Sequence, residues 1–80
     1  MKLPRDLSAE DLVQKLKYLG YRVTRQTGSH IRLTSTQNGE HHITIPNHNP
    51  LRVGTLSAIL ADIGEHFSMT RDECRQKLFE

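Results

Sequence analysis

Several residue types and sequence features are scarce in this chain, and each scarcity excludes a class of protein. The single cysteine, Cys74, excludes an intrachain disulfide framework and a cysteine-rich zinc ribbon, so a reducing cytosol is the expected compartment. No run approaches the roughly 18 consecutive apolar residues that a membrane helix needs, and residues 1–6 contain no hydrophobic signal-peptide region. Because the chain has 80 residues, of which 35% are hydrophobic, we expect residues 1–80 to form one small domain.

Positive charge is concentrated in the middle of the chain. The whole sequence has 11 Lys and Arg against 9 Asp and Glu, a net charge of +2 with neutral histidines. Between positions 15 and 56, six Lys or Arg residues stand against a single acid, Glu40, so this segment alone carries +5. A basic centre on a small domain indicates a polyanionic partner, above all nucleic acid. Charge alone leaves an ordinary mixed surface as an equal alternative.

Two amphipathic helices are predicted from apolar residues that recur at helical spacing. Ser8 is a suitable N-cap for the first helix, and Gly20 is a suitable left-handed stop. The second helix follows a polar loop at residues 47–52 and is expected to end at Gly64. The two apolar stripes consist of Leu12, Val13, Leu16 and Leu19, and of Val53, Leu56, Ile59, Leu60 and Ile63.

Three segments of alternating apolar and polar residues predict an antiparallel sheet. They span residues 21–26, 30–35 and 41–45, with turns at Thr27-Gly28-Ser29, where glycine is permissive, and at Asn38-Gly39. Alternation places Ile31, Leu33, Ile43 and Ile45 on one face, and His30, Arg32, Thr34, His42 and Thr44 on the other. The predicted fold class is α+β, an α-β-β-β-α order with helices on one face of a three-stranded sheet and a polar face opposite.

Residues 68–80 are expected to add a short C-terminal helix to a domain core at about residues 8–67. Thr70-Arg71-Asp72-Glu73 is a capping-box sequence, and it would turn Cys74 and Leu78 toward the core. We therefore expect Cys74 to be a packed residue and not a reactive one.

The segment Gly28-Ser29-His30 is the most suggestive of chemistry. His30 follows a turn at the start of a strand, on the polar face, and Arg32 comes two residues later. Histidine titrates at a pKa of roughly 6.5, so it can both take and give a proton near neutral pH, and arginine can hold a phosphate oxygen. Taken alone, this local pattern fits an ordinary surface histidine better than a catalytic one.

Three motifs, in this order, resemble the HicA toxin family: Gly28-Ser29-His30-Ile31-Arg32-Leu33, Ile43-Thr44-Ile45-Pro46-Asn47-His48, and Gly54-Thr55-Leu56-Ser57-Ala58-Ile59-Leu60. The resemblance covers about residues 8–67, and residues 68–80 lie beyond it. It implies a fold similar to a double-stranded RNA-binding domain, mRNA interferase activity, and a HicB antitoxin that occludes the active site. It also implies that His30 is catalytic, because the histidine of Gly-Ser-His has that role in the family.

The chemistry of RNA agrees with this implication. RNA can be cut without metal when its 2′-hydroxyl attacks the neighbouring phosphorus, given a base, a proton donor and positive charge on the phosphate. His30 is expected to be base or acid, and no small-molecule cofactor is needed. His42 is the first candidate for the second proton carrier, although a core-facing or idle role fits it better. His42 is also a candidate RNA-binding residue, together with Gly28, Ser29, Arg22, Arg32, Lys15 and Lys17.

The segment Gly54-Thr55-Leu56 has two possible meanings at the start of the second helix. The main expectation is that a small residue lets the helix start pack closely against a strand. Backbone N–H groups there would also attract a phosphate, and His48 and Arg52 come just before them. Such a contact would position RNA without reading its sequence.

Five histidines raise the question of a metal site, which the spacing does not favour. His41 and His42 point to opposite faces of a strand, and His48 and His66 have no Asp, Glu or Cys companion at ligand spacing. We therefore expect no metal.

The expected function is a cytosolic toxin ribonuclease that acts on mRNA, with a HicB-like antitoxin and no membrane role. The alternative is a non-catalytic double-stranded RNA-binding module, but such modules use a lysine cluster at a helix start, where this chain has only Arg52. A third possibility is a purely protein-binding domain, which weak, salt-insensitive RNA binding would indicate.

Overall fold

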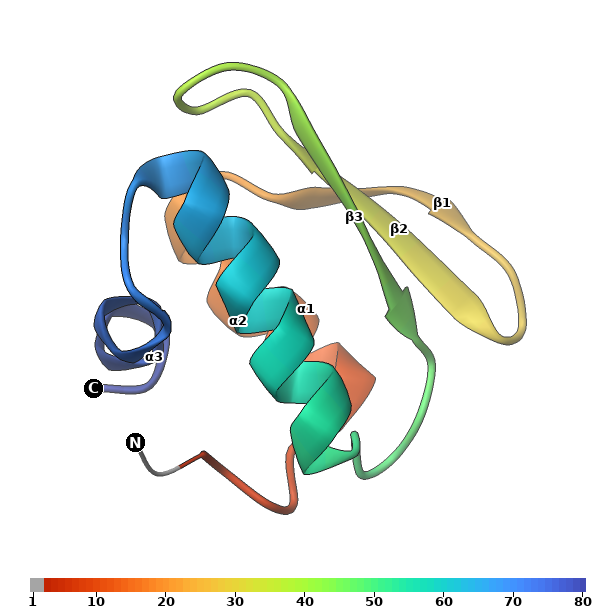
Figure 1. The fold of residues 1–80 in the computed structure, drawn as a ribbon. Coiled ribbons are helices and arrows are strands. Elements are labelled where there is room, and N and C mark those ends of the chain that lie inside the picture. Colours follow the sequence, from red (N-terminus) through yellow and green to blue (C-terminus); the bar gives the residue numbers. More distant parts are fainter. Residues whose placement is uncertain (1–2) are drawn as a thin grey trace.

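Three antiparallel strands and three α-helices make up the part of the chain that the computed structural model describes, residues 3–80 (Figure 1). Their order is α1 (Ala9–Leu16) with a 3-10 turn at Lys17–Leu19, β1 (Arg22–Gln26), β2 (His30–Ser35), β3 (His41–Pro46), α2 (Val53–Phe67) and α3 (Arg71–Phe79). The predicted α+β class, the α-β-β-β-α order and the short C-terminal helix are confirmed. Two predictions, the absence of a signal-peptide region in residues 1–6 and a domain that begins at residue 1, include residues 1–2. These two residues lie outside the described residues.

α1 begins where the sequence predicts, because Ser8 and Asp11 form a capping box. The Asp11 N–H donates to Ser8 Oγ (3.0 Å), and the Ser8 N–H donates to Asp11 Oδ2 (3.3 Å). These two bonds pair N–H groups that the end of a helix leaves without a partner. After the 3-10 turn the chain reverses at Gly20, whose φ of 80° confirms the predicted left-handed stop.

The sheet has one buried face and one exposed face, because the helices lie on one side of it (Figure 1). Its strand order is β1-β2-β3, and Ile31, Leu33, Ile43 and Ile45 are buried as alternation predicts. α1 packs toward β1 and α2 toward β3, while α3 packs on α1 and α2 from the side away from the sheet. Fully burying each such aliphatic side chain is worth about 1.5–3 kcal/mol, and a one-residue slip would expose them together. The buried apolar positions therefore fix the register that puts His30 in solvent.

A bulge in β1 changes which of its side chains face solvent. Val23 lies opposite Leu33, but the next pair is Arg25 opposite Arg32, so Thr24 is an extra residue in this strand. Regular alternation would put Arg25 on the buried face with Val23. The extra residue shifts the phase by one position, and Arg25 therefore lies on the exposed face beside Arg32.

α2 continues past the stop that the sequence predicts at Gly64. The left-handed residue at its end is Ser68, with a φ of 57°. Gly64 is buried within the helix, and a Cβ atom there would lie 2.5 Å from the Met69 carbonyl oxygen. The glycine is therefore required by the close approach of the returning chain and not by a positive φ. Val53, in the first turn, is 42% exposed, so the predicted apolar stripe begins only at Leu56.

α3 completes the core through Cys74 and Leu78, which are both buried as predicted. Its predicted capping box is formed, since the Glu73 N–H donates to Thr70 Oγ1 (3.1 Å) and the Thr70 N–H to Glu73 Oε1 (2.8 Å). Burial raises the pKa of the Cys74 thiol to about 11. The thiol is therefore neutral at physiological pH and packs as a small apolar side chain, which confirms the expectation of a structural cysteine.

Candidate nucleic-acid interface

The exposed face of the sheet, called here the outer face, carries many of the polar residues that the sequence singles out. Cross-strand pairing places Arg25, Arg32 and Thr44 in one row, Arg22, Thr34 and His42 in another, and His30 opposite Pro46 at the end of the sheet. The helices pack on the other face, so this one is left to solvent (Figure 1). An extended ligand has access to all three strands here.

His30 stands at the tip of the β1–β2 hairpin, where neighbouring residues hold its backbone and its ring. Its N–H donates to Thr27 Oγ1 (3.1 Å), and its carbonyl oxygen accepts from the Thr27 N–H (2.9 Å). The Ser29 hydroxyl lies 3.1 Å from His30 Nδ1. Asn47 ties the next loop to this turn, since it donates to the carbonyl oxygens of Ser29 (2.9 Å) and Gly28 (3.4 Å). The predicted position of His30, exposed at a strand start, is confirmed.

Gly28 does not have the conformation expected of a turn glycine. Its φ is not positive, unlike that of Gly20 and Gly39, and a Cβ atom at this position would meet no atom within 4 Å. The hydrogen bonds of Thr27 close the turn instead. The missing side chain leaves open backbone next to His30.

Three arginines give the outer face positive charge that the protein does not neutralise. Arg32 comes two residues after His30, Arg25 lies opposite Arg32, and Arg22 lies opposite Thr34. Within residues 3–80, the ion pairs of the protein involve other groups, so these three guanidinium groups stay available. A guanidinium group matches the geometry of phosphate oxygens and can bind two of them at once.

Arg25 and Asn47 are the residues that sequence reasoning did not select for the site. Regular alternation assigns Arg25 to the buried face, and only the cost of burying an arginine could have indicated a bulge. Asn47 follows the proline that ends β3, and it contacts Ser29, beside His30. These residues are far apart in the sequence, so no local pattern could have indicated the contact.

His42 is on the outer face but is held away from His30. Its Nδ1 lies 2.7 Å from Thr34 Oγ1 and its Nε2 lies 2.9 Å from Glu40 Oε2, while Thr24 Oγ1 lies 3.2 Å from Thr34 Oγ1. Because His42 pairs with Thr34, its row is four residues from His30, which is about 13 Å of strand. The structure therefore does not bring His42 and His30 to one phosphate.

The loop at residues 47–52 brings His48 to the His30 end of the sheet. The His48 N–H donates to the Pro46 carbonyl oxygen (2.9 Å), and its own carbonyl oxygen accepts from the Ala9 N–H (3.0 Å) at the start of α1. Arg52 is the N-cap of α2. Its backbone is extended, and its side chain makes no capping hydrogen bond.

The expectation that Gly54 lets the start of α2 pack closely against a strand is wrong. A Cβ atom at Gly54 would meet nothing within 4 Å, so the small residue does not serve contact with a strand. The residue is exposed, because the first turn of α2 projects into solvent, and Thr55 beside it is half-buried.

Lys15 and Lys17 are not brought together with His30. Lys15 is in α1, and Lys17 begins the 3-10 turn that follows it, on the helical side of the sheet. Lys17 Nζ donates to Gln14 Oε1 (3.1 Å). Their charge contributes to the field around the domain but not to the outer face.

Another group of polar side chains joins β3 to the end of α2. Burial, with a smaller contribution from Asp62, raises the pKa of the Tyr21 hydroxyl, so this group stays protonated, and it lies 2.6 Å from His41 Nδ1. His41 Nε2 lies 3.2 Å from Asp62 Oδ1, and the rings of His41 and His66 are stacked 4.4 Å apart. Within residues 3–80, neither this group nor another set of three His, Cys, Asp or Glu side chains is arranged to hold a metal ion.

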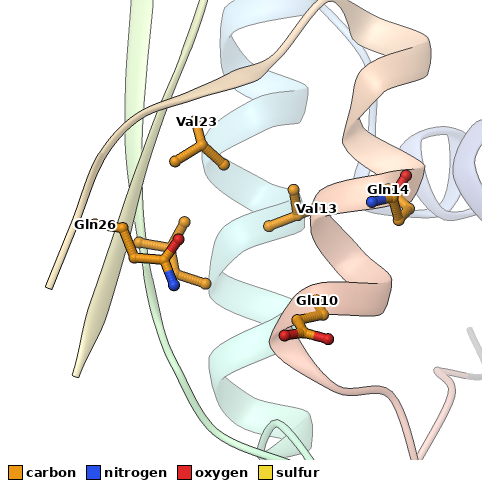
Figure 2. Close-up of a pocket in the computed structure, with 6 residues that line it drawn as sticks. Glu10, Val13, Gln14, Val23 and Gln26 are labelled. Carbon is orange, nitrogen blue, oxygen red and sulfur yellow. The ribbon is translucent and has the colours of Figure 1, made fainter. Parts of the chain in front are cut away.

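A groove of about 240 Å³ lies between α1 and β1 (Figure 2). Val13 and Val23 face each other across it, and Glu10, Gln14 and Gln26 surround them. The groove contains no cation and no histidine, so it lacks the groups that phosphate chemistry requires. It is a gap of mixed polar and apolar lining at the edge of the core and not part of the candidate site.

The fold and the outer face define a small α+β domain, with a double-stranded-RNA-binding-domain-like arrangement, that presents an arginine-rich sheet surface and a fixed, exposed histidine. The family model described as "HicA toxin of bacterial toxin-antitoxin" matches residues 9–65. The chain therefore belongs to the HicA toxin family, as its motifs indicate, and it is a toxin of a toxin–antitoxin system whose partner is a HicB-type antitoxin. α3 lies beyond the match.

No curated protein and no solved structure matches the chain at the significance required of these comparisons. Among residues 3–80, none of the helices combines the length and the apolar character needed to cross a membrane.

Proposed function

We propose that this toxin is a cytosolic endoribonuclease that cuts mRNA, with His30 as a residue that exchanges a proton with the substrate. The observation that carries the proposal is the position of His30: exposed at a hairpin tip, held by Thr27 and Ser29, and followed on the same face by Arg32. The HicA family is known for RNase activity, which supports the same assignment.

The proposed reaction uses the nucleophile that RNA already contains. A base removes the proton of a 2′-hydroxyl, the 2′-oxygen attacks the neighbouring phosphorus, and the 5′-oxygen leaves. Negative charge on the phosphate oxygens must be stabilised in the transition state, and fixed cations are effective there because they need not reorganise. Arg32 and Arg25 stand closest to His30 in the pairing pattern and are the proposed holders of this phosphate. Nothing in this chemistry calls for a metal or another cofactor.

RNA would lie along the outer face, with Arg22 on a phosphate further from the cleavage point. Gly28 and Ser29 leave open backbone and a hydroxyl at the turn, where the nucleotide at the cleaved bond would sit. Arg52, with Gly54 and Thr55 in the exposed first turn of α2, is a further proposed phosphate contact. We also propose that the HicB-type antitoxin inhibits the toxin by covering the outer face around His30.

The experiment that tests this function is inducible expression of the intact protein beside His30→Ala and Lys77→Gln variants. The intact toxin should arrest growth and degrade mRNA, His30→Ala should do neither, and Lys77→Gln, a change in α3 away from the outer face, should behave as the intact protein. RNA binding without cleavage by the intact protein would favour the non-catalytic RNA-binding module. Weak binding that does not respond to salt would favour a protein-binding role.

A further inference from the structure

In the described part of the chain, three of the five histidine rings are each held by two partners in the protein, and the other two have one partner or none. The engaged rings and their partners are His41 with Tyr21 and Asp62, His42 with Thr34 and Glu40, and His66 with the carbonyl oxygens of Gln37 and Gly39. Within residues 3–80, the His48 ring forms no hydrogen bond, and the His30 ring forms one, with Ser29. His30 and His48 therefore have ring nitrogen atoms that are free for a substrate on the sheet, whereas the unbonded Nδ1 of His66 belongs to a ring that stacks on His41 at the end of α2.

The same two histidines lie at the same end of the sheet. His30 pairs directly with Pro46, and directly opposite residues in antiparallel strands have Cα atoms about 4.5–5.5 Å apart. His48 comes two residues after Pro46, and its N–H donates back to the Pro46 carbonyl oxygen (2.9 Å), which folds the chain tightly. The bond from the Asn47 N–H to the Ser29 carbonyl oxygen keeps this loop against the His30 turn.

The backbone of His48 is fixed although its ring is exposed. Its carbonyl oxygen accepts from the Ala9 N–H, one of the N–H groups that the start of α1 cannot pair within the helix. The contact involves only main-chain atoms, so a substitution of the side chain leaves it in place. A ring that has no partner among the described residues, on a backbone that is held in place, is available to exchange a proton with a substrate within hydrogen-bond reach.

We propose that His48 is the general acid of RNA cleavage, a role that rests on the proposed ribonuclease function and completes it. His30 Nε2 takes the proton of the 2′-hydroxyl, and the bond from the 2′-oxygen to phosphorus forms. The bond from phosphorus to the 5′-oxygen breaks, and this oxygen takes a proton from the His48 ring. The products are a 2′,3′-cyclic phosphate and a 5′-hydroxyl, with one proton moved from RNA to His30 and one from His48 to RNA.

The contact between Ser29 and His30 fits this division of roles. When the His30 Nδ1–H donates to the Ser29 hydroxyl, 3.1 Å away, the lone pair of Nε2 is free to accept a proton. Within residues 3–80, the His48 ring has no such partner that would fix one tautomer. The proposal therefore gives the role of base to His30 and the role of acid to His48.

The test is a comparison of His48→Ala and His30→Ala on two RNA substrates, one natural and one with sulfur in place of the bridging 5′-oxygen. On natural RNA, each variant should lose about 10²- to 10⁴-fold in kcat/KM. A thiolate leaves without protonation, so the sulfur substrate should restore most of the rate to His48→Ala and none to His30→Ala. The pH profile of kcat/KM should be bell-shaped for the wild type, and His48→Ala should lose its decline at high pH.

The outcomes separate this inference from the proposed function. Lys77→Gln is the matched control, and wild-type rates are expected because Lys77 lies in α3, on the helical layer away from the outer face. A fully active His48→Ala beside an inactive His30→Ala would overturn the role of His48 and leave the ribonuclease proposal standing. Failure of the sulfur substrate to rescue a folded His48→Ala or His48→Asn variant would also overturn it. An active His30→Ala would overturn the proposed function itself.

Discussion

Replacing Arg25 by glutamine removes one of the three arginine charges of the outer face and leaves the buried face of the sheet unchanged. Each phosphate of a single-stranded RNA that binds a protein cation contributes about 0.7 to the slope of log K against log salt concentration. If Arg22, Arg25 and Arg32 each hold one phosphate, together they account for a slope of about 2. Arg25→Gln should therefore lower the magnitude of the slope by about 0.7 and weaken binding most at low salt.

The assay is fluorescence anisotropy of a labelled RNA between about 50 and 200 mM salt. The parent protein carries His30→Ala, and so does each variant, so that the RNA remains intact. Lys77→Gln is the matched control, because it removes the same charge from α3, which packs on the helical layer away from the sheet. Its slope should equal that of the parent. An unchanged slope for Arg25→Gln, or equal changes for both variants, would refute the claim that the bulge at Thr24 brings Arg25 into the RNA-binding face.

Further predictions concern the two glycines of α2 and the cysteine of α3. Gly64→Ala should destabilise the protein by about 1–3 kcal/mol in chemical denaturation, because the new Cβ atom would press on the Met69 carbonyl oxygen. Gly54→Ala should instead be neutral or stabilise by up to about 1 kcal/mol, since its surroundings are open and alanine favours a helix; a loss as large as that of Gly64→Ala would contradict this. The raised pKa of Cys74, about 11, means that the thiolate is rare below about pH 9. Iodoacetamide should label Cys74 only after unfolding, and rapid labelling of the native protein would show that the thiol is accessible.

The hydrophobic pattern predicts the main features of the fold because it reports directly on burial. Ile31 and Leu33 alternate with His30 and Arg32, and a sheet that is covered on one side permits only one register for such a pattern. Ser8 and Thr70 predict two helix starts because capping is a local interaction, complete within four residues. Each of these features depends on residues that are close in the sequence.

The features that sequence reasoning missed depend on contacts between distant segments. The bulge at Thr24 is set by pairing with β2, and within β1 only the cost of burying Arg25 could have indicated it. Gly64 resembles a helix stop, but the Met69 carbonyl oxygen explains the glycine, and Ser68 ends the helix. The candidate site shows the same division. The motif Gly28-Ser29-His30 predicts His30 as a site residue, whereas the contact of Asn47 with this turn is known only from the pairing of β3 with β2.

The most direct test of the central claim is the cleavage rate of a purified RNA by wild type and His30→Ala at equal folded concentration, in excess chelator. Because His30 is exposed, its removal should change stability by no more than about 0.5 kcal/mol. The rate should nevertheless fall by about 10²- to 10⁴-fold, and the wild-type products should carry a 2′,3′-cyclic phosphate and a 5′-hydroxyl. Equal rates for the two proteins would contradict the account, and so would a 5′-phosphate product or a requirement for magnesium.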